Sequence, residues 1–245
     1  RADDGGWSLE PGSGGLVQAM RPLLERREGR WIGWAGTTDE PQAGWRERVD
    51  AYSRRQSFDL VPVLQTPEQY EGFYVGFANS VLWPLFHELI DHCEFKREYF
   101  DSYREVNRTY AEAISESHTP GDATWVHDYH LMLVPQYLSE QVRRDTCGFF
   151  LHTPFPQPET FRRLPWRQEL LEGLLGYDLV GFQARRDLVN FERCVEELTD
   201  ASVDSSGARM RVERGGESVV AGVFPISCDF EDFARRAEKE SVTQE

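Results

Sequence analysis

The sequence has few of the features that mark secreted, membrane-spanning or nucleic-acid-binding proteins. It holds four cysteines, widely spaced and without a Cys-x-x-Cys pattern, so we expect reduced thiols rather than disulfides or a zinc site. No apolar run reaches the roughly 18 residues that cross a bilayer, and no signal-peptide pattern is present, which argues against membrane insertion and secretion. We therefore expect a cytoplasmic protein.

Basic residues are also scarce. The chain carries 27 Lys and Arg against 42 Asp and Glu, a formal net charge of −15. Because binding to nucleic acid or to an anionic membrane depends on clustered Lys and Arg, this balance argues against both as partners. A phosphorylated small molecule is compatible with it, since a few well-placed donors can hold such a ligand inside a negative protein.

Internal repeats, low-complexity segments and a recognisable interdomain linker are absent as well. A chain of 245 residues is long enough to bury roughly 70 % of its unfolded surface. Strand-like and helix-like patterns alternate along it, as they do in α/β folds. We therefore interpret residues 1–245 as one α/β domain.

Two short apolar runs lie near the centre of the sequence, and polar residues follow each of them. Ala123–Val126 comes before Asp128, and Cys147–Leu151 comes before His152. Runs of this length joined by a helical segment, here Leu131–Arg144, predict two parallel strands of a βαβ unit. Because ligands bind beyond the carboxyl ends of the strands in such sheets, we expect Asp128 and His152 to face one crevice and to carry the chemistry.

The remaining segments extend this pattern. Pro62 lies within one expected strand and indicates a sheet edge or a strand end, while Thr66 followed by Pro67 predicts the start of a helix. The further expected elements are strands at 30–36, 58–63 and 177–183, helices at 16–27, 95–117, 160–175 and 187–198, and a hairpin at 209–224.

A glycine-rich turn precedes the first of these helices. It ends in Gly14 and Gly15, directly before the helical pattern begins. Free backbone N–H groups and the helix dipole at such a turn can bind a phosphate. Glycines at a helix start also occur as ordinary turn residues, so the pattern alone leaves both interpretations open.

Aromatic residues are concentrated after the helix start at Thr66. Phe73 and Phe77 have the helical spacing of a core-facing stripe, and we assign them to the core. Tyr74 and Trp83 carry a polar group as well as a flat apolar face. These two are candidates for lining a sugar site.

Three histidines, His127, His130 and His152, lie at or just after the two central strands. Their spacing matches no known set of metal ligands, and we expect no metal site. Asp128 has two interpretations, a helix N-cap and a ligand contact, which are compatible with each other. His152 can likewise be a partly buried histidine with a structural hydrogen bond. Two such residues at neighbouring strand ends favour the functional interpretation.

Several of these stretches together resemble one known family, the trehalose-6-phosphate synthases, in order and at suitable spacing. The resemblance extends over essentially the whole chain. The matching segments are Gly14–Leu16, Trp31–Trp34, Tyr70–Tyr74, Phe77–Pro84, Trp125–Leu131, Gly148–Pro156, Asp178–Phe182 and Phe224–Ile226.

This resemblance implies a retaining glycosyltransferase that moves glucose from UDP-glucose to glucose 6-phosphate and forms trehalose 6-phosphate. The family has the GT-B architecture, in which two Rossmann-like domains face each other across a cleft. Residues 1–245 would then be the N-terminal, acceptor-side Rossmann-like domain, with a mostly parallel sheet flanked by helices. The C-terminal nucleotide-binding domain would be absent from these residues.

The resemblance also implies roles for individual residues. Trp34, Tyr74, Trp83 and Asp128 match acceptor-binding positions. The family's front-face mechanism uses no protein nucleophile, because the departing phosphate takes the proton of the acceptor and the protein orients and stabilises charge.

On the donor side, Gly14 and Gly15 match a loop near the phosphates of UDP-glucose, and His152 matches a residue that faces the donor sugar. Asp128 and His152 are therefore the candidate catalytic residues. No metal or other cofactor is implied, and a homo-oligomer is compatible with the pattern.

Two departures from the family pattern limit the expected activity. No strand ending in Asn-Arg, whose arginine contacts the acceptor phosphate, is found, and the basic residues that hold the UDP phosphates are expected in the second domain. We therefore expect little or no transfer by this chain alone. The alternatives are a related GT-B enzyme with another acceptor, as in glucosylglycerol phosphate or validamycin-type synthesis, and a non-catalytic module that binds a sugar phosphate or regulates.

Overall fold

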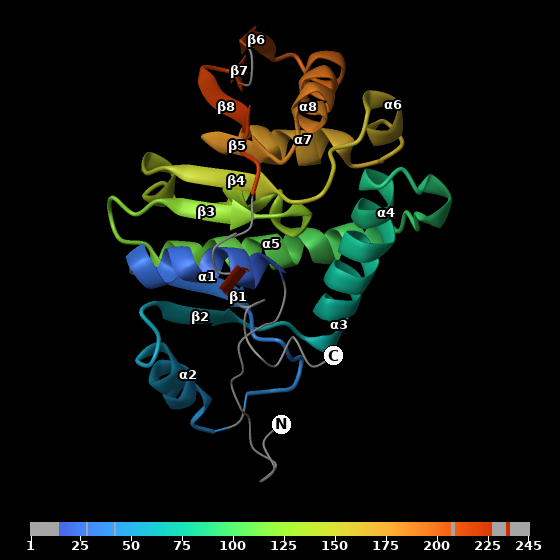
Figure 1. The fold of residues 1–245 in the computed structure, drawn as a ribbon. Coiled ribbons are helices and arrows are strands. Elements are labelled where there is room, and N and C mark those ends of the chain that lie inside the picture. Colours follow the sequence, from blue (N-terminus) through green and yellow to red (C-terminus); the bar gives the residue numbers. More distant parts are fainter. Residues whose placement is uncertain (1–14, 28, 42, 207–208, 227–233, 236–245) are drawn as a thin grey trace.

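The computed structural model describes residues 15–27, 29–41, 43–206, 209–226 and 234–235. Within them, strands form one sheet of two strands and one of six, the larger in the order β3-β4-β5-β8-β7-β6 (Figure 1). β3, β4, β5 and β8 run parallel, while β7 is antiparallel to both of its neighbours. The strands are β1 Arg30–Trp34, β2 Asp59–Val63, β3 Thr124–His127, β4 Cys147–Leu151, β5 Leu179–Phe182, β6 Ser202–Ser206, β7 Arg209–Arg214 and β8 Glu217–Val223.

The middle of the larger sheet is buried on both faces, because helices and helical turns cover it. Val126, Phe149, Val180 and Ala221 pair in one row across β3, β4, β5 and β8, and each of these side chains is buried. Continuous apolar runs are typical of parallel strands that are covered on both faces. This row therefore fixes the register of the sheet and aligns the carboxyl ends of its strands.

The longest helix, α5, joins the two sheets. Its amphipathic sequence buries one face from Phe100 to Ile114, and the helix contacts β1 and β2 as well as the helix η1. No helix in the described part of the chain is both long and apolar enough to cross a membrane. The helical elements are α1 Gly15–Arg27, α2 Trp45–Ser53, α3 Pro67–Gln69, η1 Tyr70–Leu82, α4 Trp83–Phe86, η2 Ile90–His92, α5 Arg97–Ser117, η3 Tyr129–Leu131, η4 Val134–Tyr137, η5 Val142–Arg144, α6 Pro158–Phe161, α7 Arg167–Leu175 and α8 Arg185–Leu198.

The expected crossover helix at Leu131–Arg144 was wrong. Three short 3₁₀ turns, η3, η4 and η5, connect β3 to β4 instead. Pro135 lies inside the expected helix and has no backbone N–H to donate. Side chains of α5 bind the backbone at the start of this segment: Tyr103 Oη accepts from Met132 N at 3.1 Å, and Asn107 Oδ1 accepts from Leu133 N at 3.0 Å.

Most other expected elements are present with shifted ends. The helix expected at 160–175 is divided into α6 and α7, because Pro165 lies between them and disfavours helical geometry at Leu164. Thr66 caps α3 with a full capping box, as the sequence indicates. The hairpin at 209–224 is formed by β7 and β8, whereas β6 was not expected.

Candidate active site

The structure brings Asp128 and His152 together at the carboxyl ends of β3 and β4. Asp128 Oδ1 accepts a hydrogen bond from the backbone N–H of His152 at 3.3 Å, and the Asp128 N–H donates to the carbonyl oxygen of Phe150 at 2.8 Å. The side chain of Asp128 makes no capping hydrogen bond with η3. Asp128 thus occupies the N-cap position of η3, but the expected capping by its side chain is wrong, because the carboxylate binds the end of β4 instead.

The backbone of Asp128 is strained. Its φ of 72° with a ψ of 165° lies in a region that is normally open to glycine alone. Strain of this kind costs roughly 1–3 kcal/mol and persists where the surrounding structure holds it. Here the hydrogen bonds to β4 hold it and direct the carboxylate beyond the strand ends.

His127 and His152 form a second link between the same two strands. His127 Nδ1 lies 3.1 Å from His152 Nε2. Burial, and then the proximity of His152, lower the pKa of His127 to about 4. Burial also lowers the pKa of His152, against an opposing effect of the Asp128 charge. Both imidazoles are therefore neutral near pH 7.

An aromatic wall, which we define as Trp34, Tyr70 and Tyr74, stands next to these groups. The Trp34 ring at the end of β1 stacks on Tyr70 at 5.0 Å, and Tyr70 stacks on Tyr74 at 5.3 Å between ring centroids. Tyr74 in turn stacks on His130 at 5.7 Å. Trp34 and Tyr74 are each 37 % exposed, so the wall keeps apolar area open to a ligand.

The helix η1 that carries most of this wall is a π-helix of 13 residues. Tyr74 and Trp83 are nine positions apart in the sequence, about two and a half turns of an α-helix, which would place them on opposite faces. A π-helical turn holds about one residue more, so the same separation is close to two turns. Both side chains are exposed while Phe77 and Val81 between them are buried. The wider helix therefore brings Tyr74 and Trp83 to one side.

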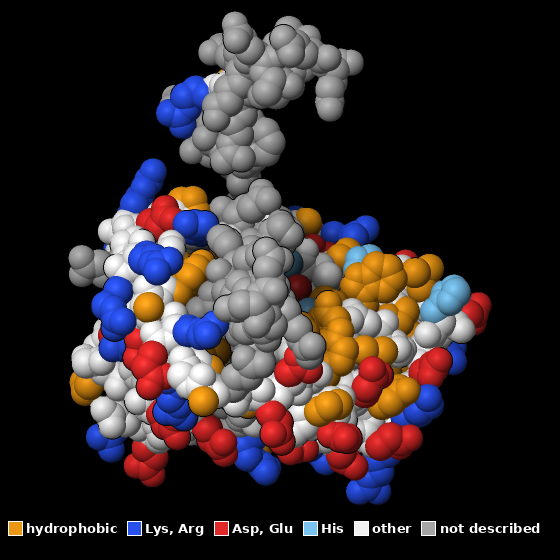
Figure 2. Space-filling view, turned by 90° about the horizontal axis from the view of Figure 1, so that it is seen from below, with side chains coloured by type: hydrophobic (Ala, Val, Ile, Leu, Met, Phe, Trp, Pro, Cys, Tyr) orange, Lys and Arg blue, Asp and Glu red, His pale blue; other side chains and the backbone are white. Residues whose placement is uncertain are grey.

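Glycines allow α5 to approach this helix closely. A Cβ on Gly76 would lie 2.5 Å from the ring of Tyr99, and one on Gly72 would lie 2.2 Å from Ser102 Oγ. The ring of Trp83, at the start of α4, lies against that of His87 in a tilted arrangement, with 4.3 Å between the centroids. On the face shown in Figure 2, hydrophobic side chains gather on one side next to histidines, with acidic side chains along their border.

Buried polar atoms without a hydrogen-bond partner mark the same edge of the molecule. Across the described residues these side-chain atoms are Gln65 Oε1, His130 Nε2 and Thr153 Oγ1. Each belongs to a residue just after the carboxyl end of β2, β3 or β4. Because buried polar groups are nearly always paired, three unpaired ones at one edge indicate a ligand site.

The glycine turn is only partly described. Gly14 lies outside the described residues, and Gly15 is the exposed first residue of α1. Its phosphate-binding role stays a prediction. The described part of the chain holds no group of three or more His, Cys, Asp or Glu residues that could bind a metal ion.

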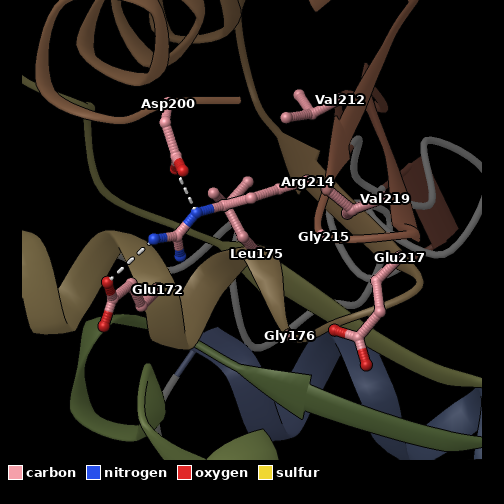
Figure 3. Close-up of a pocket in the computed structure, with 9 residues that line it drawn as sticks. All are labelled: Glu172, Leu175, Gly176, Asp200, Val212, Arg214, Gly215, Glu217 and Val219. Atoms are coloured by element: carbon pink, nitrogen blue, oxygen red, sulfur yellow. Dashed lines mark hydrogen bonds and ion pairs between the residues drawn. The ribbon is translucent and has the colours of Figure 1, made fainter. Parts of the chain in front are cut away.

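A separate cavity of about 370 Å³ lies at the opposite end of the sheet (Figure 3). Arg214 is held there by Asp200 at 2.5 Å and by Glu172 at 3.2 Å. The turn before β8 and the carboxyl end of α7 form its walls, so it opens at the amino ends of the strands. Its arginine is already paired with two carboxylates, and we do not assign the cavity to the site at the carboxyl ends.

Sequence reasoning missed three members of the site. Tyr70 belongs to the aromatic wall, His127 pairs with His152, and His130 stacks on Tyr74. His127 and His130 had been considered only as metal ligands. The position of His127 at the end of a strand was the signal that could have pointed to a partner on the next strand.

The sequence profile of glycosyltransferase family 20 matches residues 1–245. The chain belongs to this family. Trehalose-6-phosphate synthase of Mycobacterium sp. (strain JLS) is 42 % identical over 250 residues, which cover 100 % of this chain and 50 % of the relative. The bifunctional trehalose-6-phosphate synthase/phosphatase of Thermoproteus tenax is 40 % identical over 243 residues, 95 % of this chain and 32 % of the relative.

Solved structures of such enzymes share the fold. An α,α-trehalose-phosphate synthase (UDP-forming) from Burkholderia xenovorans, in complex with glucose 6-phosphate, superposes with a TM-score of 0.81 at 27 % identity and covers 96 % of this chain and 52 % of its own. The Escherichia coli enzyme bound with UDP-2-fluoro glucose has a TM-score of 0.79 at 30 % identity, with 95 % and 50 % covered.

These comparisons confirm the family resemblance and the fold class. The chain is an α/β protein with a mostly parallel sheet flanked by helices, as in GT-B trehalose-phosphate synthases. It spans about half the length of the mycobacterial synthases that it matches. Its membership in a family of glycosyltransferases makes it part of an enzyme family.

Proposed function

We propose that this chain is the N-terminal, acceptor-side domain of an enzyme that transfers glucose from UDP-glucose to glucose 6-phosphate, releasing UDP and trehalose 6-phosphate. The observation that carries the proposal is the set of groups found just beyond the carboxyl ends of β2, β3 and β4. A strained carboxylate, an aromatic wall and three unpaired buried polar atoms meet there. Relatives that share the fold include one solved with glucose 6-phosphate and one with a fluorinated UDP-glucose.

On the acceptor side, the wall supplies apolar area and Asp128 supplies charge. The flat faces of Trp34 and Tyr74 suit the C–H faces of a pyranose, and Trp83 extends this surface. The carboxylate of Asp128 accepts hydrogen bonds from sugar hydroxyls, and such charged hydrogen bonds are worth roughly 1.5–3 kcal/mol each. Together they orient the acceptor hydroxyl toward the donor.

On the donor side, His152 faces the transferred sugar. The bond between C1 of glucose and the β-phosphate oxygen breaks, and the acceptor oxygen bonds to C1 on the same face. The departing phosphate takes the proton of that hydroxyl. Asp128 and His152 act by orientation and by stabilising charge, since neither forms a covalent intermediate. Gly14 and Gly15 are assigned to the donor phosphates by the same proposal.

The leaving diphosphate needs positive charge that the described residues of this site do not provide. No described Lys or Arg forms an ion pair with Asp128, and the histidine pair is neutral. Stabilising a phosphate that leaves requires fixed donors or cations near it. We therefore propose that residues 1–245 alone have little turnover. A cofactor-free reaction, a cytoplasmic location and assembly into a homo-oligomer belong to the same proposal.

A coupled assay of UDP release tests this function. It compares residues 1–245 alone with the same residues joined to the remaining half of the Mycobacterium sp. JLS synthase, using UDP-glucose and glucose 6-phosphate. We expect turnover of the joined protein only. Turnover by residues 1–245 alone would show that they supply the charge that the leaving diphosphate needs. Equal use of another acceptor would favour a related GT-B enzyme.

Binding is measured separately by calorimetry of glucose 6-phosphate with residues 1–245. Asp128→Asn should weaken binding about tenfold or more, because it removes a charged hydrogen-bond acceptor. Glu140→Gln, at a side chain that is 93 % exposed, is the matched control and should bind normally. If glucose 6-phosphate binds to residues 1–245 but the joined protein shows no turnover, the chain would be a non-catalytic module that binds a sugar phosphate.

A further inference from the structure

The contact between His127 and His152 restricts both side chains more than an ordinary hydrogen bond does. Its two atoms, His127 Nδ1 and His152 Nε2, are 3.1 Å apart. A neutral imidazole has one nitrogen that donates and one that accepts, so one of these two atoms must carry the hydrogen and the other a lone pair. The tautomer of one ring therefore determines the tautomer of the other.

The neighbours of the pair decide which ring donates. Trp125 packs on His127 at 4.6 Å and Phe150 meets His152 edge-on at 4.8 Å, and neither offers an oxygen to the ring nitrogens. The charged neighbour is Asp128, whose Oδ1 already accepts from the backbone N–H of His152. Nδ1 is the ring nitrogen nearer to the backbone. The carboxylate therefore favours an N–H at Nδ1 of His152 over one at Nε2.

We propose that His127 is a positioning residue that donates from Nδ1 to His152 Nε2 and thereby holds His152 as the Nδ1–H tautomer. The opposite tautomer of His152 would place a lone pair, instead of an N–H, beside the carboxylate of Asp128. The functional consequence rests on the function proposed above: with its only ring N–H directed to Asp128, His152 faces the donor sugar in one tautomer and one ring orientation. The donor sugar thus meets a preorganised group, as electrostatic stabilisation requires.

A proton added to His152 Nε2 would break this link, because two N–H groups would then face each other. Burial lowers the pKa of His127 to about 4 and lowers that of His152 as well. Among the other titratable groups at this edge, Asp128 opposes the shift in His152, and burial lowers the pKa of His130 and raises the pKa of Tyr129. The pair therefore keeps one shared hydrogen through the neutral pH range.

Two variants separate the hydrogen bond from the shape of the ring. His127→Phe keeps a ring against Trp125 and removes the donor. His127→Asn places an amide N–H near the position of Nδ1, so it retains a donor toward His152. If His127 only fills space, His127→Phe should keep the properties of the unmodified protein more closely than His127→Asn. The proposed role predicts the reverse.

The test is ¹⁵N NMR of histidine-labelled residues 1–245 at pH 7, which reports the protonation of each ring nitrogen. We expect a protonated Nδ1 and a bare Nε2 for His152 in the unmodified protein and in His127→Asn, and a mixture of tautomers in His127→Phe. A protonated Nε2 on His152, or an unchanged tautomer in His127→Phe, would overturn the proposal. The signals of the unmodified protein decide the tautomer even when a variant fails to fold.

This experiment needs no substrate, so its outcome is independent of the proposed function. The kinetic consequence is measured in the joined protein. We expect His127→Phe to raise the KM for UDP-glucose about tenfold, the effect of one hydrogen bond, and His127→Asn to restore most of it. The KM for glucose 6-phosphate should stay unchanged. If NMR shows the expected tautomers but both variants have normal kinetics, then His127 does position His152. The contact of His152 with the donor sugar would in that case be refuted.

Discussion

Replacement of Asp128 by glycine and by alanine tests whether its backbone is strained. Both substitutions remove the carboxylate and the hydrogen bond from the His152 N–H. They differ in one atom, the Cβ, which is what disfavours a φ of 72° with a ψ of 165°. We therefore expect Asp128→Gly to be more stable than Asp128→Ala, the reverse of the usual order of these two residues.

The size of the difference follows from two opposing effects. Relief of strain in this backbone region contributes roughly 1–3 kcal/mol in favour of glycine. The greater freedom of glycine in the unfolded chain costs roughly 0.5–1 kcal/mol. At their mid-values of roughly 2 and roughly 0.75 kcal/mol, these two effects leave about 1.3 kcal/mol in favour of Asp128→Gly. For a domain of this size that is a difference in Tm of about 3–5 °C.

Urea and thermal unfolding followed by circular dichroism measure this difference. The same pair of substitutions at Glu112, an exposed position in α5, is the control. Alanine should be the more stable residue there by about 1 kcal/mol. Equal stability of the two Asp128 variants, or a more stable alanine variant, would refute the strain. Both Asp128 variants should lose glucose 6-phosphate binding.

Three further predictions concern packing, pH and thiol reactivity. Gly76→Ala should lower the free energy of unfolding by about 1–3 kcal/mol in urea, because its Cβ would lie 2.5 Å from the ring of Tyr99. Hydrogen bonds from a backbone N–H and from His118 lower the pKa of Asp145, so Asp145 stabilises the fold above its unfolded pKa of about 3.9. Asp145→Asn should therefore destabilise the protein at pH 7. The difference in stability between this variant and the unmodified protein should vanish as the pH falls through the lowered pKa of Asp145 in the folded state. Burial raises the pKa of Cys147 to about 12, so a thiol reagent should leave it unmodified in the folded protein at pH 8.

Each of these has an outcome that contradicts it. Unchanged stability of Gly76→Ala would mean that α5 is not packed tightly on η1. Glu112→Ala, at an exposed position in α5, is the control. A constant difference for Asp145→Asn from pH 7 to pH 3 would exclude the ionised carboxylate as its cause. Fast labelling of Cys147 would show that β4 opens in the native state.

The sequence determined the parts of this protein that depend on local pattern. Apolar runs that end in Asp128 and His152 predicted two buried parallel strands, and the alignment of strand ends in such a sheet predicted that the two residues would meet. The capping box at Thr66 and the hairpin of β7 and β8 also follow from a few adjacent residues. Each of these features has its cause within one short segment or in a general rule of sheet topology.

The tertiary structure decided the features whose partners lie far apart in the chain. Tyr103 and Asn107 of α5 bind the backbone N–H groups of Met132 and Leu133 and fix the turns that stand in place of the expected crossover helix. The π-helical turns that bring Tyr74 and Trp83 to one side, and the contact of His127 with His152, have no signature in residue spacing. Hydrogen bonds between distant segments outweigh local preference at these points, because a buried polar group left without a partner costs more than an irregular backbone.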